Sequence, residues 1–149
     1  MRQSNLTSIN IEVTEWGMTF TKAELAYLEG QRLGRLATTG PGGSLQNSPT
    51  GFRVDTETGV VDIYGRAMGT TRKFHNVRTN PQVAFVVDDV ASTDPWRVRG
   101  VEIRGEAEAV EDHEPPSPHL SRQIIRIHPR RIISWGVDPA QEGMKGRDV

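Results

Sequence analysis

The chain has 149 residues, which is most simply one domain with a single core. A formal net charge of −1 and a pI near 6.4 argue against a general binder of nucleic acid or anionic membranes, because such a protein needs a clear basic excess. The absence of cysteine excludes disulfides, thiolate metal sites and a cysteine nucleophile, and the sequence lacks an apolar run long enough for a membrane span, so we expect a cytoplasmic protein.

The start of the chain is predicted to contain an extension and one helix. Residues 1–17 are polar and mixed in composition, and we expect a poorly ordered extension there. Thr21 and Glu24 have the spacing of a capping box, so a helix is predicted to begin at Thr21 and to end near Gly30. We therefore expect the folded domain to span residues 18–137, followed by a C-terminal tail at 138–149.

Three strands are predicted next, at residues 33–39, 45–54 and 60–65. The Gly-Pro-Gly-Gly sequence at 40–43 is a strong turn signal, so the first two strands are expected to form a hairpin. Pro49 and Gly51 indicate a bulge or an edge within the second strand. Turn residues at 55–59 lead into the third strand.

The segment from Gly69 to Val77 has the composition of a phosphate-binding turn. A glycine and two threonines precede Arg72 and Lys73, which open a short amphipathic helix predicted over residues 70–80. We expect the threonine hydroxyls and the free N–H groups of the first helical turn to point outward, where the helix dipole and the Lys73 charge favour an anion. An ordinary capped surface helix with a solvated basic face would show the same pattern.

Further strands are predicted in the second half of the chain, at residues 83–87, 100–111, 123–128 and 131–136. A loop at 88–96 separates the first two, and residues 100–111 alternate apolar and polar side chains, as a half-buried strand does. A proline-rich connector at 113–118 follows, and Pro129 separates the last two strands. Several strands, short turns and two small helices predict a mainly antiparallel barrel.

The order and spacing of these segments resemble the pyridoxamine-phosphate-oxidase-like split barrels that bind flavins and deazaflavins, and within them the actinobacterial branch of coenzyme F420-dependent enzymes. The resemblance covers residues 18–137 and rests on Leu36-Ala37-Thr38, Pro49-Thr50-Gly51-Phe52, the segment 71–77, Asn80-Pro81 and the segments 100–105 and 130–136. It implies a mainly β fold, a six-stranded antiparallel split β-barrel of the FMN-binding type with short helices. It also implies a homodimer with two cofactor sites across the interface, which the abundant apolar strand surface favours as well.

The resemblance implies which residues form the site. The phosphate turn would comprise Thr70, Thr71, Arg72, Lys73 and Asn76, with Lys73 matching the lysine that contacts the cofactor phosphate. Thr38, Ser48, Pro49 and Thr50 would flank the tricyclic ring, and Arg66, Ala67 and Met68 would lead into the phosphate turn. Trp135 would reach the site of the partner subunit. Ordinary helix and strand positions explain the same residue types, and no catalytic side chain is assigned, since solvent can supply a proton.

Coenzyme F420 is the expected cofactor and FMN the alternative, because both present a tricyclic ring and a phosphate. F420 carries a further acidic tail, for which Lys22, Arg53, Arg66 and Arg72 are available. The implied activity is a reductase that transfers hydride from F420 to a small organic acceptor; an FMN-dependent oxidoreductase and a non-catalytic deazaflavin carrier stay open. The short connector argues against a vitamin-B6 oxidase. The four histidines lack ligand spacing, so no metal site is expected.

Overall fold

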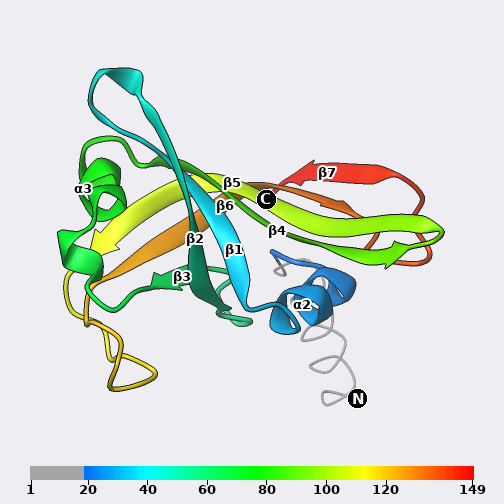
Figure 1. Ribbon diagram of the computed structural model, residues 1–149, viewed down its shortest axis with the longest axis horizontal. Helices are drawn as coiled ribbons and strands as arrows, with labels where there is room; N and C mark the ends of the chain where they lie inside the picture. Colours follow the sequence, from blue (N-terminus) through cyan, green and yellow to red (C-terminus); the bar gives the residue numbers. More distant parts are fainter. Residues whose placement is uncertain (1–18) are drawn as a thin grey trace, which may run out of the picture.

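The computed structural model describes residues 19–149, so the expectation for residues 1–17 lies outside the described part of the chain. In chain order the elements are α2 Lys22–Glu29, β1 Leu33–Thr39, η1 Pro41–Gly43, β2 Leu45–Val54, β3 Val61–Tyr64, η2 Met68–Thr70, α3 Arg72–Thr79, β4 Gln82–Thr93, β5 Trp96–Val110, β6 Ile124–Trp135 and β7 Met144–Asp148. All seven strands belong to one sheet, in the order β3-β2-β1-β4-β5-β6-β7. A further pairing of β3 with β6 closes the first six strands into an antiparallel ring (Figure 1), which confirms the predicted mainly β, six-stranded split barrel with short helices.

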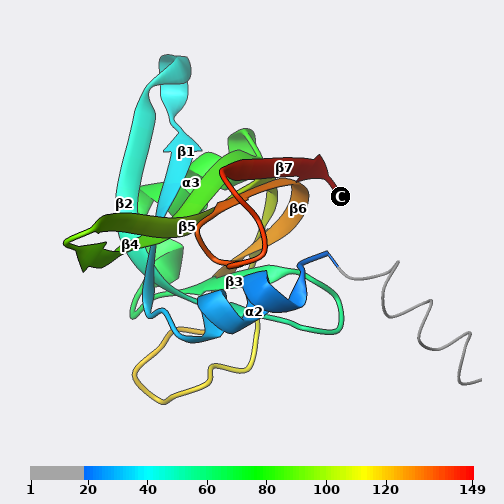
Figure 2. The ribbon, with the colours of Figure 1, turned by 90° about the vertical axis from the view of Figure 1, so that its right-hand side faces the viewer.

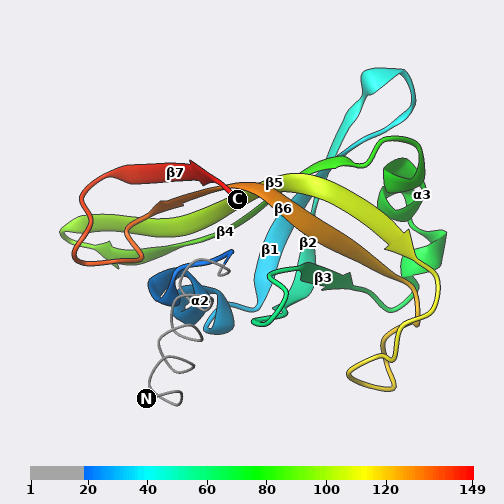
Figure 3. The ribbon, with the colours of Figure 1, turned by 180° about the vertical axis from the view of Figure 1, so that it is seen from behind.

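The ring is closed over only part of its length because β6 has two different neighbours on one edge. Its first half pairs with β3, through Ile125 to Ile127, and its second half pairs with β7, through Arg131 to Trp135. The long β4–β5 hairpin and β7 therefore extend away from the ring, at the end of the sheet opposite α3 (Figures 1 and 3). The β1–β2 hairpin also projects beyond the ring (Figure 2).

The core fills the ring with side chains that alternate inward along the strands. Its most buried members are Leu36 of β1, Ile63 of β3, Phe85 of β4, Ile103 of β5 and Ile125 of β6, all at most 1% exposed. α3 packs against β1 and β5 and adds Phe74 and Val77 to this core. Within residues 19–149, no helix is long and apolar enough to cross a membrane.

Two local predictions agree closely with the structure. The capping box of α2 is present: the Thr21 N–H donates to Glu24 Oε1 at 2.9 Å, and the Glu24 N–H donates to Thr21 Oγ1 at 3.1 Å. β1 and β2 form the predicted hairpin at the predicted bounds. Pro49 is tolerated inside β2 because β3 pairs with β2 only from Gly51 onward, so the second edge of β2 is free at the proline.

The predicted loop at 88–96 is wrong. β4 continues to Thr93 and β5 begins at Trp96, so the two strands form one long hairpin with a bulge between Val90 and Ser92. Charged and polar residues in this stretch suggested a loop, but both faces of the hairpin tip are exposed to solvent. A strand there needs no apolar alternation.

The predicted break at Pro129 is also wrong, because β6 runs unbroken from Ile124 to Trp135. The register against β5 shifts between Arg104 and Gly105, and Pro129 lies opposite Gly105 at this bulge. A bulge interrupts the ladder locally, so a residue without an N–H is accepted there. A Cβ on Gly105 would lie 2.2 Å from the His128 carbonyl oxygen, so the close approach of the two strands requires glycine.

β7 lies in the segment 138–149, which was expected to be a C-terminal tail that follows the folded domain. Its five residues are mostly exposed, so they carry no hydrophobic pattern. An ion pair anchors the strand instead: the Arg147 guanidinium donates to Glu24 Oε1 at 2.6 Å and to Oε2 at 2.9 Å. The Glu24 side chain is 1% exposed, so a helix-capping residue also holds the last strand.

Candidate functional site

The predicted phosphate turn consists of η2 followed directly by α3. Thr71 is the N-cap of α3: its Oγ1 accepts from the Phe74 N–H at 3.3 Å and donates to the Met68 carbonyl at 2.7 Å. Thr70 Oγ1 donates to the Ala67 carbonyl at 2.9 Å. The expectation that both hydroxyls point outward as free donors is therefore wrong, since their protons are used inside the turn.

Open donors are nevertheless present at the start of α3. Within the described residues, the backbone N–H groups of Arg72 and Lys73 have no hydrogen-bond partner, as expected for the first two positions of a helix. The Arg72 side chain is exposed and that of Lys73 half-buried, and neither forms an ion pair with another described residue. Two open amides and two positively charged residues thus lie at the end of the helix where its dipole favours an anion.

Asn76 connects this helix to the barrel rather than facing solvent. Its Nδ2 donates to Thr38 Oγ1 at 3.0 Å and to Gln46 Oε1 at 2.9 Å, and both Asn76 and Thr38 are buried. Both amide protons are therefore used to hold α3 against β1 and β2. The structure brings two predicted site residues together here, in a positioning arrangement.

The residues that lead into the turn differ in their exposure to solvent. Met68 is fully buried in the core, whereas Arg66 and Ala67 are exposed. The Met68 N–H donates to Ser121 Oγ at 3.1 Å, and the Ser121 N–H donates to the Gly65 carbonyl at 2.9 Å. Ser121, which lies between the connector and β6, thus fixes the turn. The sequence did not indicate this role because a lone serine in a loop carries no pattern.

The three predicted ring-flanking residues of β2 alternate in direction. Pro49 lies on the outer face of the sheet, opposite Arg35 of β1, and is exposed. Ser48 is half-buried and Thr50 is 6% exposed, both on the inner face with Leu36. The Thr50 hydroxyl has no hydrogen-bond partner among the described residues. These three side chains therefore do not face one common surface.

A hollow of about 420 Å³ opens over β1, β4 and β5. Its lining contains small residues, among them Ala37, Ala84 and Gly105, together with larger ones such as Leu45 and Arg104. Of the four residues predicted to flank the ring, only Thr38 lines it. Ala37 and Ala84 were not predicted, because alanine on a strand has no distinctive chemistry.

Thr38 links this hollow to the phosphate turn. It lines the hollow and accepts the hydrogen bond from Asn76, which lies three residues after Lys73 on α3. Three residues of helix correspond to about 4.5 Å along the axis. The Asn76–Thr38 hydrogen bond therefore joins α3 directly to a strand residue that lines the hollow.

Trp135 lies away from these groups in its own protomer. It pairs with Gly100 of β5 and Met144 of β7, and a Cβ on Gly100 would lie 2.5 Å from the Trp135 ring. Figures 1 and 3 place β7 and α3 at opposite ends of the sheet. A single chain therefore does not bring Trp135 to the phosphate turn.

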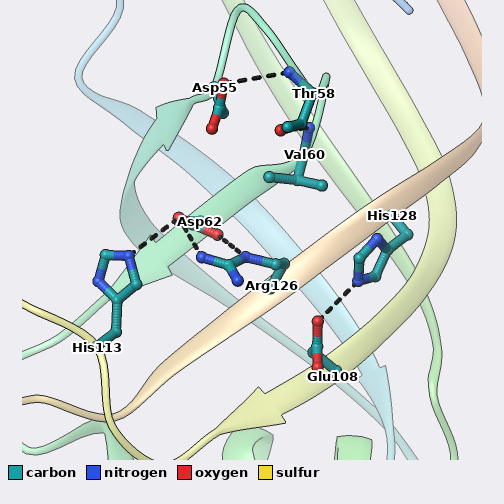
Figure 4. Close-up of polar contacts among 8 residues, drawn as sticks. All are labelled: Asp55, Thr58, Val60, Asp62, Glu108, His113, Arg126 and His128. Carbon is teal, nitrogen blue, oxygen red and sulfur yellow. Dashed lines mark hydrogen bonds and ion pairs between the residues drawn. The ribbon is translucent and has the colours of Figure 1, made fainter.

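A polar network on the outside of the barrel holds the connector that follows β5 (Figure 4). Arg126 of β6 donates from Nε and Nη2 to the Asp62 carboxylate at 2.8 and 3.1 Å, and His113 Nε2 lies 3.8 Å from the same carboxylate. The hydrogen bond to Asp62 raises the pKa of Arg126. In the part of the chain that the structure describes, no group of acidic, histidine or cysteine side chains could hold a metal ion.

Comparisons with known proteins indicate the family of this chain and a relative of known activity. The family model for pyridoxamine 5′-phosphate oxidase matches residues 20–136. A 5a,11a-dehydrotetracycline/5a,11a-dehydrooxytetracycline reductase of Streptomyces rimosus is 47% identical over 134 residues, which is 89% of this chain and 94% of that protein.

Solved structures extend the comparison. A protein described as an F420 reductase superposes with a TM-score of 0.58 at 27% identity, over 76% of this chain and 98% of that chain. The conserved hypothetical protein Rv2991 from Mycobacterium tuberculosis superposes with a TM-score of 0.62 at 25% identity, over 85% and 94% of the two chains.

Proposed function

Because the chain belongs to the pyridoxamine 5′-phosphate oxidase family, we propose that it is an oxidoreductase, a reductase that uses coenzyme F420 to reduce a small organic acceptor. The similarity to a reductase of Streptomyces rimosus over nearly the whole chain supports a reductase. The likeness to an F420 reductase supports the deazaflavin over FMN. The structural observation that carries the proposal is the open, doubly basic start of α3 beside the hollow at Thr38.

The phosphate of the coenzyme would be held at the start of α3. The N–H groups of Arg72 and Lys73 would donate to its oxygens, and the Lys73 ammonium would add a charge-assisted hydrogen bond. Thr70 and Thr71 shape the turn, and Asn76 with Thr38 keeps the helix in place. The residues present therefore fit a phosphate group.

The hollow over β1, β4 and β5 would hold the tricyclic ring. The small side chains in its lining would leave room for a flat group, and Leu45, which is 83% exposed, also lines it. The bound coenzyme supplies a hydride. The chain's own contribution would be to bind and orient the ring and to exclude water. Glu106 is the only carboxylic acid in the hollow's described lining, and its carboxylate lies 3.6 Å from the Arg130 guanidinium. We therefore assign the proton to solvent.

We also propose that the site is completed in a homodimer. Trp135 cannot reach the phosphate turn of its own protomer, and large apolar side chains such as Trp96 and Met144 are each 67% exposed at the same end of the sheet. If this surface packs against a second copy, the Trp135 end of each subunit would meet the phosphate turn of the other.

The proposal is tested by titrating the purified protein with F420 and with FMN, and then by screening acceptors with chemically reduced F420. Dehydrotetracyclines and other compounds with a conjugated double bond come first, given the activity named for the relative. Turnover with F420 and none with FMN supports the proposal. Flavin absorbance after purification would favour an FMN-dependent enzyme, and tight F420 binding without turnover on a wide panel would favour a carrier.

A further inference from the structure

The residues between the connector and β6 contact the segment that leads into the start of α3. The segment 65–68 joins β3 to η2. Ser121 binds this segment at both ends: its N–H donates to the Gly65 carbonyl at 2.9 Å, and its Oγ accepts from the Met68 N–H at 3.1 Å. Ser121 does not line the hollow at Thr38, so its effect on a ligand there would pass through the residues that it holds.

The contact with Met68 fixes one rigid peptide group. The peptide bond between Ala67 and Met68 is planar, so its N–H and its carbonyl oxygen move together. Ser121 Oγ holds the N–H. The carbonyl oxygen, which belongs to Ala67, accepts from the Thr70 N–H at 3.1 Å and from Thr70 Oγ1 at 2.9 Å. Ser121 and Thr70 are thus connected through a single peptide group.

The same residue, Met68, also leads to the open amides of α3. Thr71 is the N-cap of this helix, and its N–H and Oγ1 both donate to the Met68 carbonyl, at 3.0 and 2.7 Å. The N–H groups of Arg72 and Lys73 follow directly. The position of these two amides therefore depends on where Met68 is held, and Ser121 holds it.

A second contact joins the same two segments. The Gln123 side chain lies over Gly69 of η2: a Cβ on Gly69 would be 3.0 Å from Gln123 Cδ and 3.1 Å from Cγ. Gln123 directly precedes β6, and its carbonyl lies 3.1 Å from Ser121 Oγ. The start of β6 therefore braces the turn at two neighbouring points.

Removal of the Ser121 hydroxyl would leave the Met68 N–H without its acceptor. Met68 is fully buried, so water does not readily take the place of that acceptor, and an unpaired buried N–H is costly. The cost favours a rotation of the peptide group, which would move the Ala67 carbonyl away from Thr70. Donors bind an anion well only when they are held in place before it arrives.

We propose that Ser121 is a positioning residue for the anion at the start of α3. It acts through the Ala67–Met68 peptide group and sets the affinity of the Arg72 and Lys73 amides for that anion. This rests on the proposed function insofar as the anion is the phosphate of the coenzyme. Because coupling between two sites is reciprocal, an anion bound at α3 should in turn strengthen the contacts of Ser121 with the turn.

The test measures, by isothermal titration, the affinity of the full chain for F420 and for inorganic phosphate. Ser121→Ala removes the hydroxyl, and Ser121→Thr keeps one at the same position. Ser117→Ala is the matched control, because Ser117 lies in the same segment between β5 and β6 and its Oγ accepts a local hydrogen bond from the His119 N–H at 3.3 Å. Urea unfolding establishes that each variant is folded under the conditions of the titration.

We expect Ser121→Ala to weaken the binding of both probes roughly three- to tenfold, the range of one neutral hydrogen bond. Ser121→Thr should keep most of the affinity, and Ser117→Ala should bind as wild type does. A purely structural role would lower the urea midpoint and leave the affinity of the folded protein unchanged. Wild-type affinity in Ser121→Ala, or an equal loss in Ser117→Ala, would therefore overturn the proposal.

Amide hydrogen exchange gives a second measurement that needs no turnover. Saturating phosphate should slow the exchange of the Met68 N–H and of the N–H at position 121 in wild type, and Ser121→Ala should lose most of this protection. If phosphate leaves the exchange of both amides unchanged in wild type, the coupling is absent and the proposal is wrong.

The two probes separate this proposal from the proposed function. Wild type that binds phosphate but not F420 would refute the use of F420, and the phosphate titrations would still decide the role of Ser121. Wild type that binds F420, with equal affinity in Ser121→Ala, would refute the role of Ser121 alone. Wild type that binds neither probe would overturn both.

Discussion

Lys73 and its neighbours show how much of a site can be inferred from residue types alone. The basic pair at the start of α3 and the N-cap at Thr71 were predicted from local sequence, because capping and helix dipoles depend on residues a few positions apart. The direction of the threonine hydroxyls was not, since it depends on the η2 turn bringing the Ala67 and Met68 carbonyls within reach. Nor could the sequence show that the Asn76 amide is used inside the barrel.

Replacing Lys73 by alanine is expected to weaken F420 binding about ten- to hundredfold. The change removes a charge-assisted hydrogen bond worth roughly 1.5–3 kcal/mol, and each 1.4 kcal/mol is about a factor of ten. Isothermal titration measures the loss, and added phosphate should compete with F420 less in the variant. Arg122→Ala is the control, because Arg122 is an exposed cation in the segment between β5 and β6. Unchanged affinity in Lys73→Ala would mean that α3 is an ordinary capped surface helix.

Asn76→Ala is expected to lower the free energy of unfolding by about 1–3 kcal/mol, because Thr38 and Gln46 both lose a buried partner. Thr38→Val, which keeps the shape and removes one acceptor, should cost about 1 kcal/mol. Urea unfolding of both single variants and the double variant gives the coupling between them. Independent, additive losses would contradict a direct Asn76–Thr38 bond.

Elements with a local signal were predicted with correct bounds, and those without one were missed. β1, β2 and α2 carry turn glycines, alternation or a capping box within their own residues. The unbroken β6 depends on a bulge opposite Gly105, and β7 depends on Arg147 reaching a glutamate 123 positions earlier. Such long-range pairings leave no periodic pattern in the segment that they stabilise.

Gly105→Ala is expected to destabilise the fold by about 2 kcal/mol or more, because the added Cβ would lie 2.2 Å from the His128 carbonyl oxygen and force the β5–β6 bulge apart. Gly51→Ala is the matched control in a strand, since nothing lies within 4 Å of its Cβ position. It should be neutral or slightly stabilising. Thermal unfolding compares the two, and equal melting temperatures would contradict the close strand approach.

The Glu24–Arg147 ion pair should make stability depend on pH in acid. Burial alone would raise the pKa of Glu24, but hydrogen bonds from Arg147 and from the Thr21 N–H lower it below its ordinary value of 4.5. A carboxyl with a lowered pKa contributes stability above its ordinary value, and this contribution is lost as the pH falls below it.

Glu24→Gln removes that titration. At neutral pH we expect it to lower the free energy of unfolding by about 2 kcal/mol, since Arg147 loses its partner. The difference from wild type should shrink as the pH falls below 4.5, the ordinary value of the group. Urea unfolding across this range checks the sign, and a constant difference would contradict the assignment.

At the scale of the whole molecule, the ring of six strands was predictable, whereas the assembly stays a prediction. The barrel follows from alternation and turn signals, but where a second copy binds depends on surfaces that both chains present. The separation of α3 from Trp135, and the exposure of Trp96 and Met144, are the features of this chain that point to a partner. Light scattering at micromolar concentration should therefore give the mass of a dimer.

A mixing experiment tests whether the dimer completes the site. If Lys73 of one subunit and Trp135 of the other form each site, then Lys73→Ala and Trp135→Ala homodimers both have two damaged sites. A mixed dimer has one site with both lesions and one site with neither, because the twofold interface pairs each subunit's Lys73 with its partner's Trp135. Unfolding and refolding the two variants together should then restore about a quarter of the wild-type F420 sites, from half of the dimers with one intact site each. The separately refolded variants are the control. If mixing restores none, while both variants remain dimers by light scattering, Trp135 does not complete the partner's site.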